Sequence, residues 1–412
     1  MKSIPDQLRI GVFFGGTSPE HEVSVITGLQ AVAALNEDGG TGGDLGETAL
    51  TITPVYVTKS GSWYVGESLD QVEHYADVSS LVDTAVEVAA ASGPGRTMQL
   101  VPVRQGRWRR TEPVVIDVAL AAFHGAAGEN GAFQGLCEML GVPWTGCGVA
   151  ASSIGMDKAL AKQLVSAAGV CVVPGRVLRE AAWRGSEDSV LEQLPAELGW
   201  PLIVKPVRMG SSIGISRAGD EQALDAAIEE AFRFDSAVLV EYAVPNLREI
   251  NASVLGMGAR AAVSVLEEPV SASGLLSFED KYMRGDSSSV GTKRGMASLD
   301  RKIPAPVSDS VADEVRAMAL DVFAALNASG VARIDFLMND ETGDVYFNEI
   351  NTIPGSFSFY LWQPAGVPFR ELLERLVRLA LDRFSTEHER VSRFEVNLLS
   401  DRAARGLKSG KA

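Results

Sequence analysis

A short stretch near residue 340 carries acidic, amide and guanidinium side chains at alternating positions. Arg333 and Asp335 share one strand-like run, turn-forming residues cover 339–343, and Glu349 and Asn351 share the next run. Successive side chains of a strand point to opposite faces, so each pair lies on one face. A hairpin would bring the four polar groups together, which suits Mg²⁺ bound between carboxylates and substrate phosphates. The alternative is a solvated hairpin face with a surface ion pair.

A Gly/Ser-rich segment, 210–214, follows a buried apolar strand that ends at Lys205. Backbone N–H groups of such a loop, which holds Ser211 and Ser212, can surround phosphate oxygens, and the lysine would neutralise their charge. The spacing is not that of a P-loop, which excludes a Walker-type ATPase. The alternative is a plain turn between two strands.

Further polar residues stand at the ends of other apolar strands. Glu241 and Glu249 flank a Pro-Asn turn, where carboxylates can accept hydrogen bonds from an adenine amino group or a ribose hydroxyl. The Ser18–Glu20 turn and His124 follow two strands of an expected α/β sheet, and such sheets bind ligands outside the carboxyl ends of their strands. Both should therefore face one substrate cleft, unless the acids are solvent-facing and the histidine is structural.

The elements that must position these residues follow from hydrophobic patterning. Apolar runs at 10–14, 51–57 and 114–123 alternate with helical patterns, which predicts an open parallel sheet, whereas 89–110 is irregular. Ser18 and Pro19 suggest an N-cap and a first helical residue, before an apolar helical stripe.

The pattern of predicted helices and strands changes near residue 150, which indicates further domains. A helix at 159–168 and strands at 201–205, 212–216 and 238–242 predict a small α+β unit, and a third α+β unit ends in an amphipathic helix at 369–381. We therefore expect an α/β protein of three domains with a loosely held tail. The expected boundaries are 1–150, 151–244 and 245–385, followed by the tail at 386–412.

Composition narrows the class of protein and its compartment. The 412 residues are 46% hydrophobic and 22% charged, which is typical of globular proteins, and the net charge of -16 argues against nucleic-acid and anionic-membrane partners. Three cysteines without CxxC spacing predict neither a disulfide framework nor a zinc site. No signal peptide or long apolar run is visible, so we expect a cytoplasmic protein with no membrane partner.

Taken in order, several stretches resemble the D-alanine:D-alanine ligase family of the ATP-grasp superfamily. The likeness extends from about residue 8 to residue 381 and implies a three-domain ATP-grasp fold. The stretches are FFGGTSPEHEVS, HGAAGENGAFQG, WTGCGVAASSIGMDK, PLIVKPVRMGSSIG, FEDKY, ARIDF and NEINTIPG. All seven stretches occur in the same order as in the family, so together they are far more specific than any one stretch alone.

The resemblance implies a role for each matching residue. Glu20, supported by Ser24 and with His124 nearby, would hold the amino group of the first substrate. Lys158 and Lys205 would contact the phosphates of ATP, and Glu241 and Glu249 would surround its adenine and ribose. Ser211 and Ser212 would lie in the loop that covers the phosphates. Lys281 and Tyr282 would lie in a mobile loop that closes the site. Arg333 and the Gly355 backbone would face the developing oxyanion. Asp335, Glu349 and Asn351 would bind magnesium.

The chain also departs from the family pattern. After NTIPG the family usually has Thr-Ser and a further Ser that hold the carboxylate of the second substrate, whereas this chain has bulky residues around Ser356 and Ser358, with Phe359, Tyr360 and Trp362 following. We expect Ser356 and Ser358 to contact the second substrate in a reshaped pocket. Met209 replaces a common acid, and the stretch 286–289 differs as well.

The implied activity is ATP-dependent formation of D-alanyl-D-alanine for peptidoglycan precursors, through an acyl phosphate. ATP and two Mg²⁺ ions, with Mn²⁺ as an alternative, are the implied cofactors, and a homodimer formed through the first domain is the implied assembly. Two alternatives stay open at this point. One is a related ligase with a different acceptor, such as D-lactate, D-serine or a specialised amino acid, and the other is a non-catalytic nucleotide-binding relative.

Overall fold

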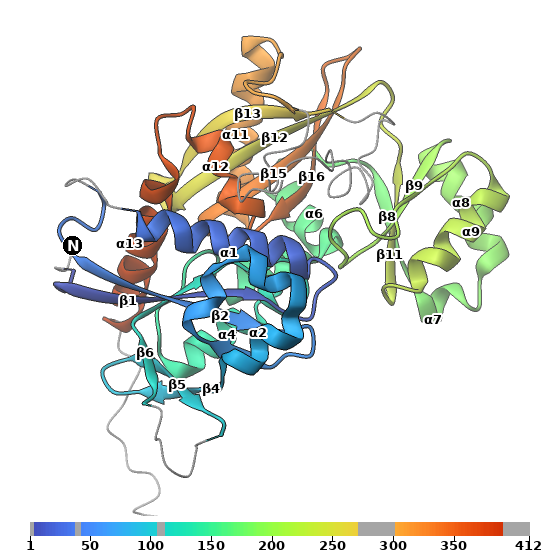
Figure 1. The fold of residues 1–412 in the computed structure, drawn as a ribbon. Coiled ribbons are helices and arrows are strands. Elements are labelled where there is room, and N and C mark those ends of the chain that lie inside the picture. Colours follow the sequence, from blue (N-terminus) through green and yellow to red (C-terminus); the bar gives the residue numbers. More distant parts are fainter. Residues whose placement is uncertain (1–3, 38–42, 105–111, 271–300, 390–412) are drawn as a thin grey trace, which may run out of the picture.

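A computed structural model describes residues 4–37, 43–104, 112–270 and 301–389 of the chain (Figure 1). Three sheets, of seven, four and five strands, organise these residues. No helix among them is both long and apolar enough to span a bilayer. The α/β class and the three-part architecture expected from the sequence are confirmed.

The first sheet is parallel at its centre and antiparallel beyond. β1 (Gln7–Gly15) lies between β2 (Ala49–Val57) and β7 (Val118–Ala121), and both pairings are parallel as predicted. The other four strands add on in antiparallel fashion, and two of them lie largely in the stretch 89–110 for which no element was predicted. These are β3 (Trp63–Val65), β4 (Val86–Gly93), β5 (Thr97–Pro102) and β6 (Val114–Ile116).

Two local predictions for this domain need correction. The apolar run 114–123 is not one strand, because Asp117 interrupts it and accepts hydrogen bonds from the backbone and guanidinium of Arg9 at 2.7–2.9 Å. Helix α1 (His21–Asn36) begins at His21, and not at Pro19. The Ser18 hydroxyl instead accepts a hydrogen bond from the Glu20 N–H at 3.0 Å, which closes a turn before the helix starts.

The core of the first domain includes a helix from the far end of the chain. Val25, Leu29 and Val32 of α1 are buried on it, as the apolar stripe predicted. Leu372 and Leu376 of α13 (Phe369–His388) belong to the same core, and Figure 1 shows this last helix beside β1 and α1. Shorter helices complete the domain, namely α2 (Val78–Thr84), α3 (Ala126–Glu129) and α4 (Ala132–Leu140), with η1 (Glu67–Asp70) and η2 (Val72–Asp77).

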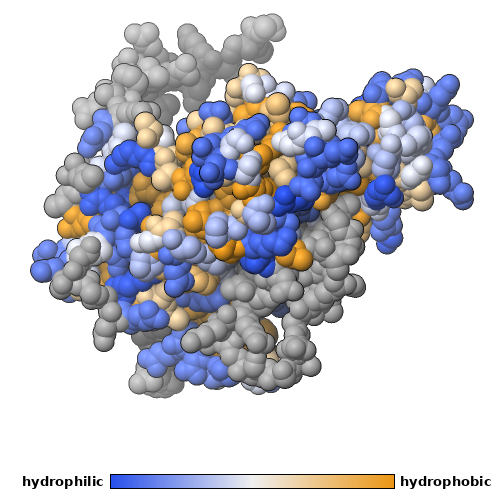
Figure 2. Space-filling view, turned by 90° about the horizontal axis from the view of Figure 1, so that it is seen from above, coloured by the Kyte–Doolittle hydropathy of each residue, from blue (hydrophilic) through white to orange (hydrophobic). Residues whose placement is uncertain are grey.

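The central sheet projects from the rest of the molecule (Figure 1) and is wholly antiparallel, in the order β10-β9-β11-β8. Hydrophilic residues cover most of this projecting part in Figure 2. The predicted strand 212–216 is wrong, because Ser211 and Ser212 adopt left-handed φ angles of 52° and 61° in a turn. The elements are β8 (Gly175–Arg179), α7 (Glu180–Trp183), α8 (Glu187–Leu198), β9 (Leu202–Pro206), β10 (Ser216–Ala218), α9 (Glu221–Phe232) and β11 (Ala237–Tyr242).

The third sheet has the order β14-β13-β12-β15-β16, again antiparallel throughout. Its strands are β12 (Leu247–Met257), β13 (Ala262–Pro269), β14 (Arg301–Lys302), β15 (Ser329–Asn339) and β16 (Val345–Asn351). One face packs on α5 (Val149–Met156), α6 (Lys158–Ala167) and α11 (Asp309–Ala325), which share its apolar core. The chain then continues through η5 (Gly355–Ser358) and α12 (Phe359–Trp362), while η3 (Gly258–Arg260) joins β12 to β13.

Candidate active site

A row of polar side chains crosses the third sheet on the face away from its helices. The strand register places Glu267 opposite Asn251, Asn251 opposite Asp335, and Asp335 opposite Glu349. Residues directly opposite one another in neighbouring strands point to the same face. The intervening Ile250, Ile334, Phe336 and Ile350 are buried in the core on the other face. The hairpin predicted from the alternating pattern is therefore confirmed.

Arg333 is anchored within this row. Its Nε and Nη2 atoms donate to the two carboxylate oxygens of Asp335 at 2.7 and 2.8 Å, and the Asn351 amide donates to the same carboxylate at 3.1 Å. Burial disfavours the charge of Arg333, but the charge and hydrogen bonds of Asp335 raise its pKa well above the ordinary value. The bidentate contact fixes the plane of the guanidinium as well as its charge.

The three expected metal ligands form an oxygen-rich set. Asp335 and Glu349 each carry a cationic partner, Arg333 on the first and Lys158 at 3.1 Å on the second. No group of three His, Cys, Asp or Glu side chains suited to a metal occurs within the described ranges. Two carboxylates with the Asn351 amide oxygen still fit Mg²⁺, which commonly takes one or two protein carboxylates and completes its shell with phosphates and water.

A cavity between the central and third sheets gathers the expected nucleotide-binding residues. Lys158, Lys205, Ser212, Glu241 and Glu249 line it together with Asp335 and Glu349. The Lys158 ammonium donates to the Met209 carbonyl at 2.7 Å, which ties the Gly/Ser loop to α6. Asn348, an extra residue in a bulge of β16, accepts a hydrogen bond from Lys205 at 3.1 Å. The bulge therefore turns one more polar group into the cavity.

Lys162 was missed by the sequence reasoning. Its ammonium lies 2.6 Å from the Glu241 carboxylate, which also binds Lys205, and all three side chains are buried. Burial lowers the pKa of Lys162 to about 8, and the two lysines lower the pKa of Glu241 although burial acts to raise it. The spacing of four residues from Lys158 on one helix was the available signal, because such residues share a face.

A second cavity joins residues from all three domains. Glu20, His124, Ser211, Glu249, Arg333 and Gly355 line it with the three expected metal ligands. The Ser211 hydroxyl donates to the Glu20 carboxylate, which links the central domain to the turn after β1. A Cβ atom on Gly125 would lie 2.4 Å from a Glu20 oxygen, so a larger residue there would displace the carboxylate, and the φ angle of +66° itself favours glycine.

Ser24 and His124 are engaged with their own domain. The buried Ser24 hydroxyl donates to the Ala122 carbonyl and accepts from the Gly15 N–H, both at 2.8 Å, which joins the ends of β1 and β7. The Nε2 atom of His124 lies 2.8 Å from the Thr27 hydroxyl. Burial lowers the pKa of His124 to about 4, so the ring is neutral near pH 7.

The two serines expected at the second substrate, Ser356 and Ser358, are engaged or buried within the protein. The Ser356 hydroxyl donates to Gln30 at 2.6 Å, and the Ser358 hydroxyl is fully buried without a partner among the described residues. Neither lines the cavity that holds Glu20 and Arg333. Lys281 and Tyr282 lie outside the described residues, so their placement stays a prediction.

Glu129 is a further residue that lacked a predicted role. One of its oxygens accepts a hydrogen bond from the Gly125 N–H at 2.6 Å and the other from the Ile353 N–H at 3.1 Å. Burial and the nearby charge of Glu20 raise its pKa to about 8. It lies within the HGAAGENGAFQG stretch, but only the tertiary contacts reveal that it joins the first domain to the third.

Asn251, Glu267 and Arg301 also line the cavity that holds Glu20 and Arg333, and sequence reasoning missed all three. Tyr360, noted in the sequence only as a bulky residue, completes a cluster with them by contacting Glu267 and Arg301. Glu267 accepts hydrogen bonds from Asn251, Arg301 and Tyr360 at 3.1, 2.8 and 3.2 Å. The Arg301 guanidinium carbon lies 4.0 Å from the centre of the Tyr360 ring. The side chains come from β12, β13, β14 and α12, so no single local motif contains them.

Known proteins resemble the chain along nearly all of its length. The family models described as D-ala D-ala ligase N-terminus and C-terminus match residues 9–147 and 164–378. A D-alanine–D-alanine ligase of Thermosipho melanesiensis is 34% identical, with 95% of this chain and 98% of that protein covered. The D-alanine–D-alanine ligase A of Bradyrhizobium diazoefficiens is 39% identical, with 92% and 96% covered.

Solved structures agree with these sequence relatives. The D-alanine-D-alanine ligase of Coxiella burnetii matches with a TM-score of 0.73 and 27% identity, covering 97% of this chain and 99% of that one. The VanG D-Ala:D-Ser ligase of Enterococcus faecalis matches with a TM-score of 0.71 and 28% identity, covering 91% and 99%.

Proposed function

Because the chain belongs to the D-alanine:D-alanine ligase family, we propose that it joins two D-alanine molecules at the expense of ATP. One observation carries the proposal, namely that a single cavity is lined by all three domains. Glu20 comes from the first domain, Ser211 from the central domain, and Arg333 with Asp335 from the third. The product, D-alanyl-D-alanine, is a building block of peptidoglycan.

The first step transfers a phosphoryl group to the first D-alanine. Glu20, which accepts a hydrogen bond from the Ser211 hydroxyl, holds its ammonium group, so that its carboxylate points toward the metal-binding row. Lys158 and Lys205 neutralise the phosphates of ATP, and buried Glu241 keeps Lys205 in place. Asp335, Glu349 and Asn351 would hold Mg²⁺, which would supply additional positive charge at the phosphate oxygens. The bond between the γ-phosphorus and the bridging oxygen breaks, a bond to the carboxylate oxygen forms, and ADP leaves.

In the second step, the amine of the second D-alanine attacks the acyl phosphate. Arg333, held in one plane by Asp335, and the Gly355 backbone N–H face the oxygen that gains negative charge. The amine loses a proton, the new C–N bond forms, and inorganic phosphate leaves. Water must be excluded throughout because it would hydrolyse the acyl phosphate.

The finer details of the proposal rest on the family resemblance. They are two Mg²⁺ ions, replaceable by Mn²⁺, a homodimer formed through the first domain, and a cytoplasmic location. The net charge of -16 supports the absence of a nucleic-acid partner.

The test is ADP release by the purified chain with Mg-ATP and D-alanine, with L-alanine as the control and mass spectrometry of the product. We expect D-alanyl-D-alanine from D-alanine alone. Mixtures of D-alanine with D-lactate or D-serine probe the acceptor. Turnover only with a mixture would replace the proposed product, and tight Mg-ATP binding with no turnover in any mixture would refute ligase activity.

A further inference from the structure

We infer that the cluster of Asn251, Glu267, Arg301 and Tyr360 is the acceptor-binding end of the cavity. In this arrangement Arg301 holds the carboxylate of the incoming amino acid, and the Asn251 oxygen accepts a hydrogen bond from its amine. The inference rests on the proposed ligation and names the residues that select its second substrate. Those residues recognise a small amino acid with a free carboxylate.

Glu267 organises the cluster. Its carboxylate is 1% exposed and accepts hydrogen bonds from three different strands or helices, through Asn251, Arg301 and Tyr360. A buried carboxylate that accepts three hydrogen bonds is held in one orientation, because each hydrogen bond restricts its rotation further. Glu267 thereby sets the positions of the side chains around it, and it does not itself need to contact substrate.

Arg301 is held in a defined orientation at this end. Its side chain is 6% exposed, pairs with Glu267 at 2.8 Å and lies over the Tyr360 ring. A guanidinium can serve more than one carboxylate, because its N–H groups point in several fixed directions within one plane. Arg301 lines the cavity together with Arg333. Since Arg333 is bound in bidentate fashion by Asp335, the two guanidinium groups can act on different anionic groups of the reactants.

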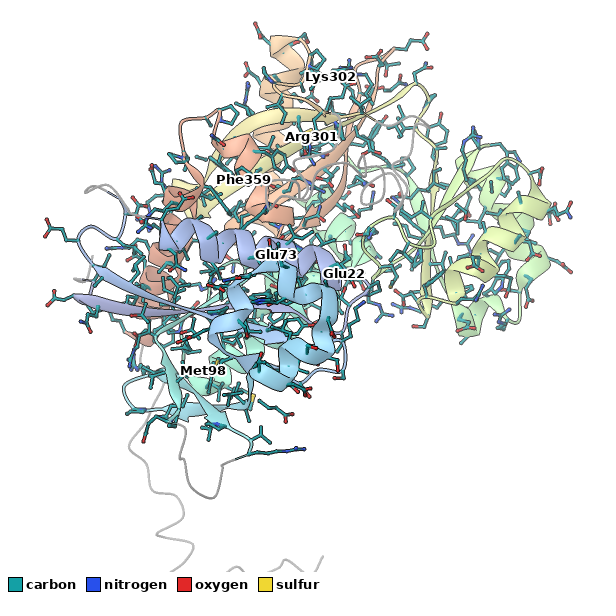
Figure 3. The ribbon with its side chains drawn as sticks, in the orientation of Figure 1. Glu22, Glu73, Met98, Arg301, Lys302 and Phe359 are labelled. Carbon is teal, nitrogen blue, oxygen red and sulfur yellow. The ribbon has the colours of Figure 1, made fainter. Side chains whose placement is uncertain are left out.

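The neighbouring lysine provides a contrast. Lys302 follows Arg301 in the same short strand, but its side chain is 53% exposed and pairs with Glu268 on the other face of β13. Figure 3 shows Lys302 toward the outside of the molecule and Arg301 further in. The alternation of β14 thus sends one cation into the cavity and the other to the surface.

Asn251 supplies the complementary group. Its amide nitrogen must face Glu267, because a carboxylate only accepts hydrogen bonds, and this orients the amide oxygen the other way. That oxygen is buried and has no partner within the described part of the chain. A buried acceptor without a donor is costly. An amine bound between Asn251 and the acyl phosphate would satisfy it.

The local backbone also supports a role for Tyr360. Ser356, Phe357 and Ser358 all adopt left-handed φ angles of 50–53°, which non-glycine residues rarely do. Neither serine lines the cavity, and the turn leads into α12, where Tyr360 reaches Glu267. The segment therefore positions a phenol against the guanidinium in place of exposed hydroxyl groups.

The test is a competition between two acceptors. D-Alanine and D-alaninamide are supplied together with Mg-ATP, and the two dipeptide products are quantified by mass spectrometry. The amide cannot serve as first substrate because it lacks a carboxylate, so the product ratio reports acceptor choice alone. We expect the wild type to favour D-alanine and Arg301→Gln to reduce that preference about 10-fold or more, as expected for loss of a charged hydrogen bond.

Two matched variants complete the design. Lys302→Gln removes the adjacent, outward-facing charge and should leave the ratio unchanged. Arg301→Lys keeps the charge but loses the planar fork, so its ratio should fall between those of the wild type and Arg301→Gln. An unchanged ratio in both Arg301 variants, or an equal change in Lys302→Gln, would overturn the inference.

A separate measurement distinguishes this inference from the proposed function. Hydroxylamine traps an acyl phosphate as a hydroxamate and needs no acceptor site. A wild type that forms neither hydroxamate nor dipeptide from D-alanine would contradict the ligase proposal itself. Retained hydroxamate formation in Arg301→Gln shows that the variant is folded and active in the first step. If Arg301→Gln forms no hydroxamate, the role of Arg301 is decided by the ratio of the two dipeptide products that Arg301→Lys forms.

Discussion

Replacing Glu129 by Gln should remove a specific pH dependence from the stability of the protein. Glu129 lies on α3, and its two oxygens accept hydrogen bonds from Gly125 in the first domain and Ile353 in the third. Burial and the charge of Glu20 raise its pKa from 4.5 to about 8. The folded protein therefore binds this proton more tightly than the unfolded chain does.

The sign and size of the effect follow from this shift. The pKa of Glu129 is 4.5 in the unfolded chain and about 8 in the folded protein. The proton therefore stabilises the fold fully below pH 4.5, and this stabilisation is lost as the pH rises through about 8. At about 1.36 kcal/mol for each pKa unit, the free energy of unfolding should fall by about 3 kcal/mol between pH 6 and pH 9 from this group alone. Gln cannot ionise, so Glu129→Gln should lose this part of the dependence.

The assay is urea unfolding of the wild type and Glu129→Gln at intervals from pH 6 to pH 9. Gln cannot accept hydrogen bonds from both N–H groups, so a constant loss of about 1–3 kcal/mol is expected as well. The diagnostic quantity is therefore how the difference in free energy of unfolding between the wild type and Glu129→Gln changes with pH. Glu20→Gln is the control, since removing that charge should shift the decline to lower pH. Parallel curves for the wild type and Glu129→Gln would refute the reasoning.

Three further predictions concern the metal site, the nucleotide cavity and the shared core. Glu349→Gln should lower ADP release about 1,000-fold or more, because metal-bound charge stabilisation is worth several kcal/mol, while circular dichroism stays unchanged; an active variant would contradict the metal assignment. Lys162→Met should destabilise the fold by about 1–3 kcal/mol, because Glu241 loses one of its two lysine partners and keeps Lys205. The same variant should raise the KM for ATP. Unchanged stability and unchanged KM would argue against a role of Lys162 in the nucleotide cavity. Leu376→Ala should cost about 2–5 kcal/mol in urea unfolding, because the side chain is 1% exposed in the core; a loss below about 1 kcal/mol would show that α13 contributes little to that core.

The tertiary structure alone decided which distant groups meet. Glu267, Arg301 and Tyr360 come from β13, β14 and α12, and only the pairing of strands and the left-handed turn before α12 bring them together. The split of the run 114–123 at Asp117 depends on Arg9, more than 100 residues away. Likewise, α13 reads as an ordinary amphipathic helix, but its apolar stripe completes the core of the first domain.

The sequence by itself determined the local geometry of the candidate site. Alternation with period two placed Arg333 with Asp335, and Glu349 with Asn351, because a strand has only two faces. Polar residues after Phe14 and Phe123 predicted one cleft, since parallel strands end at the same edge of a sheet, and Glu20 and His124 do line one cavity. Local backbone periodicity thus sets the direction of each side chain, whereas burial of apolar faces between distant segments sets its neighbours.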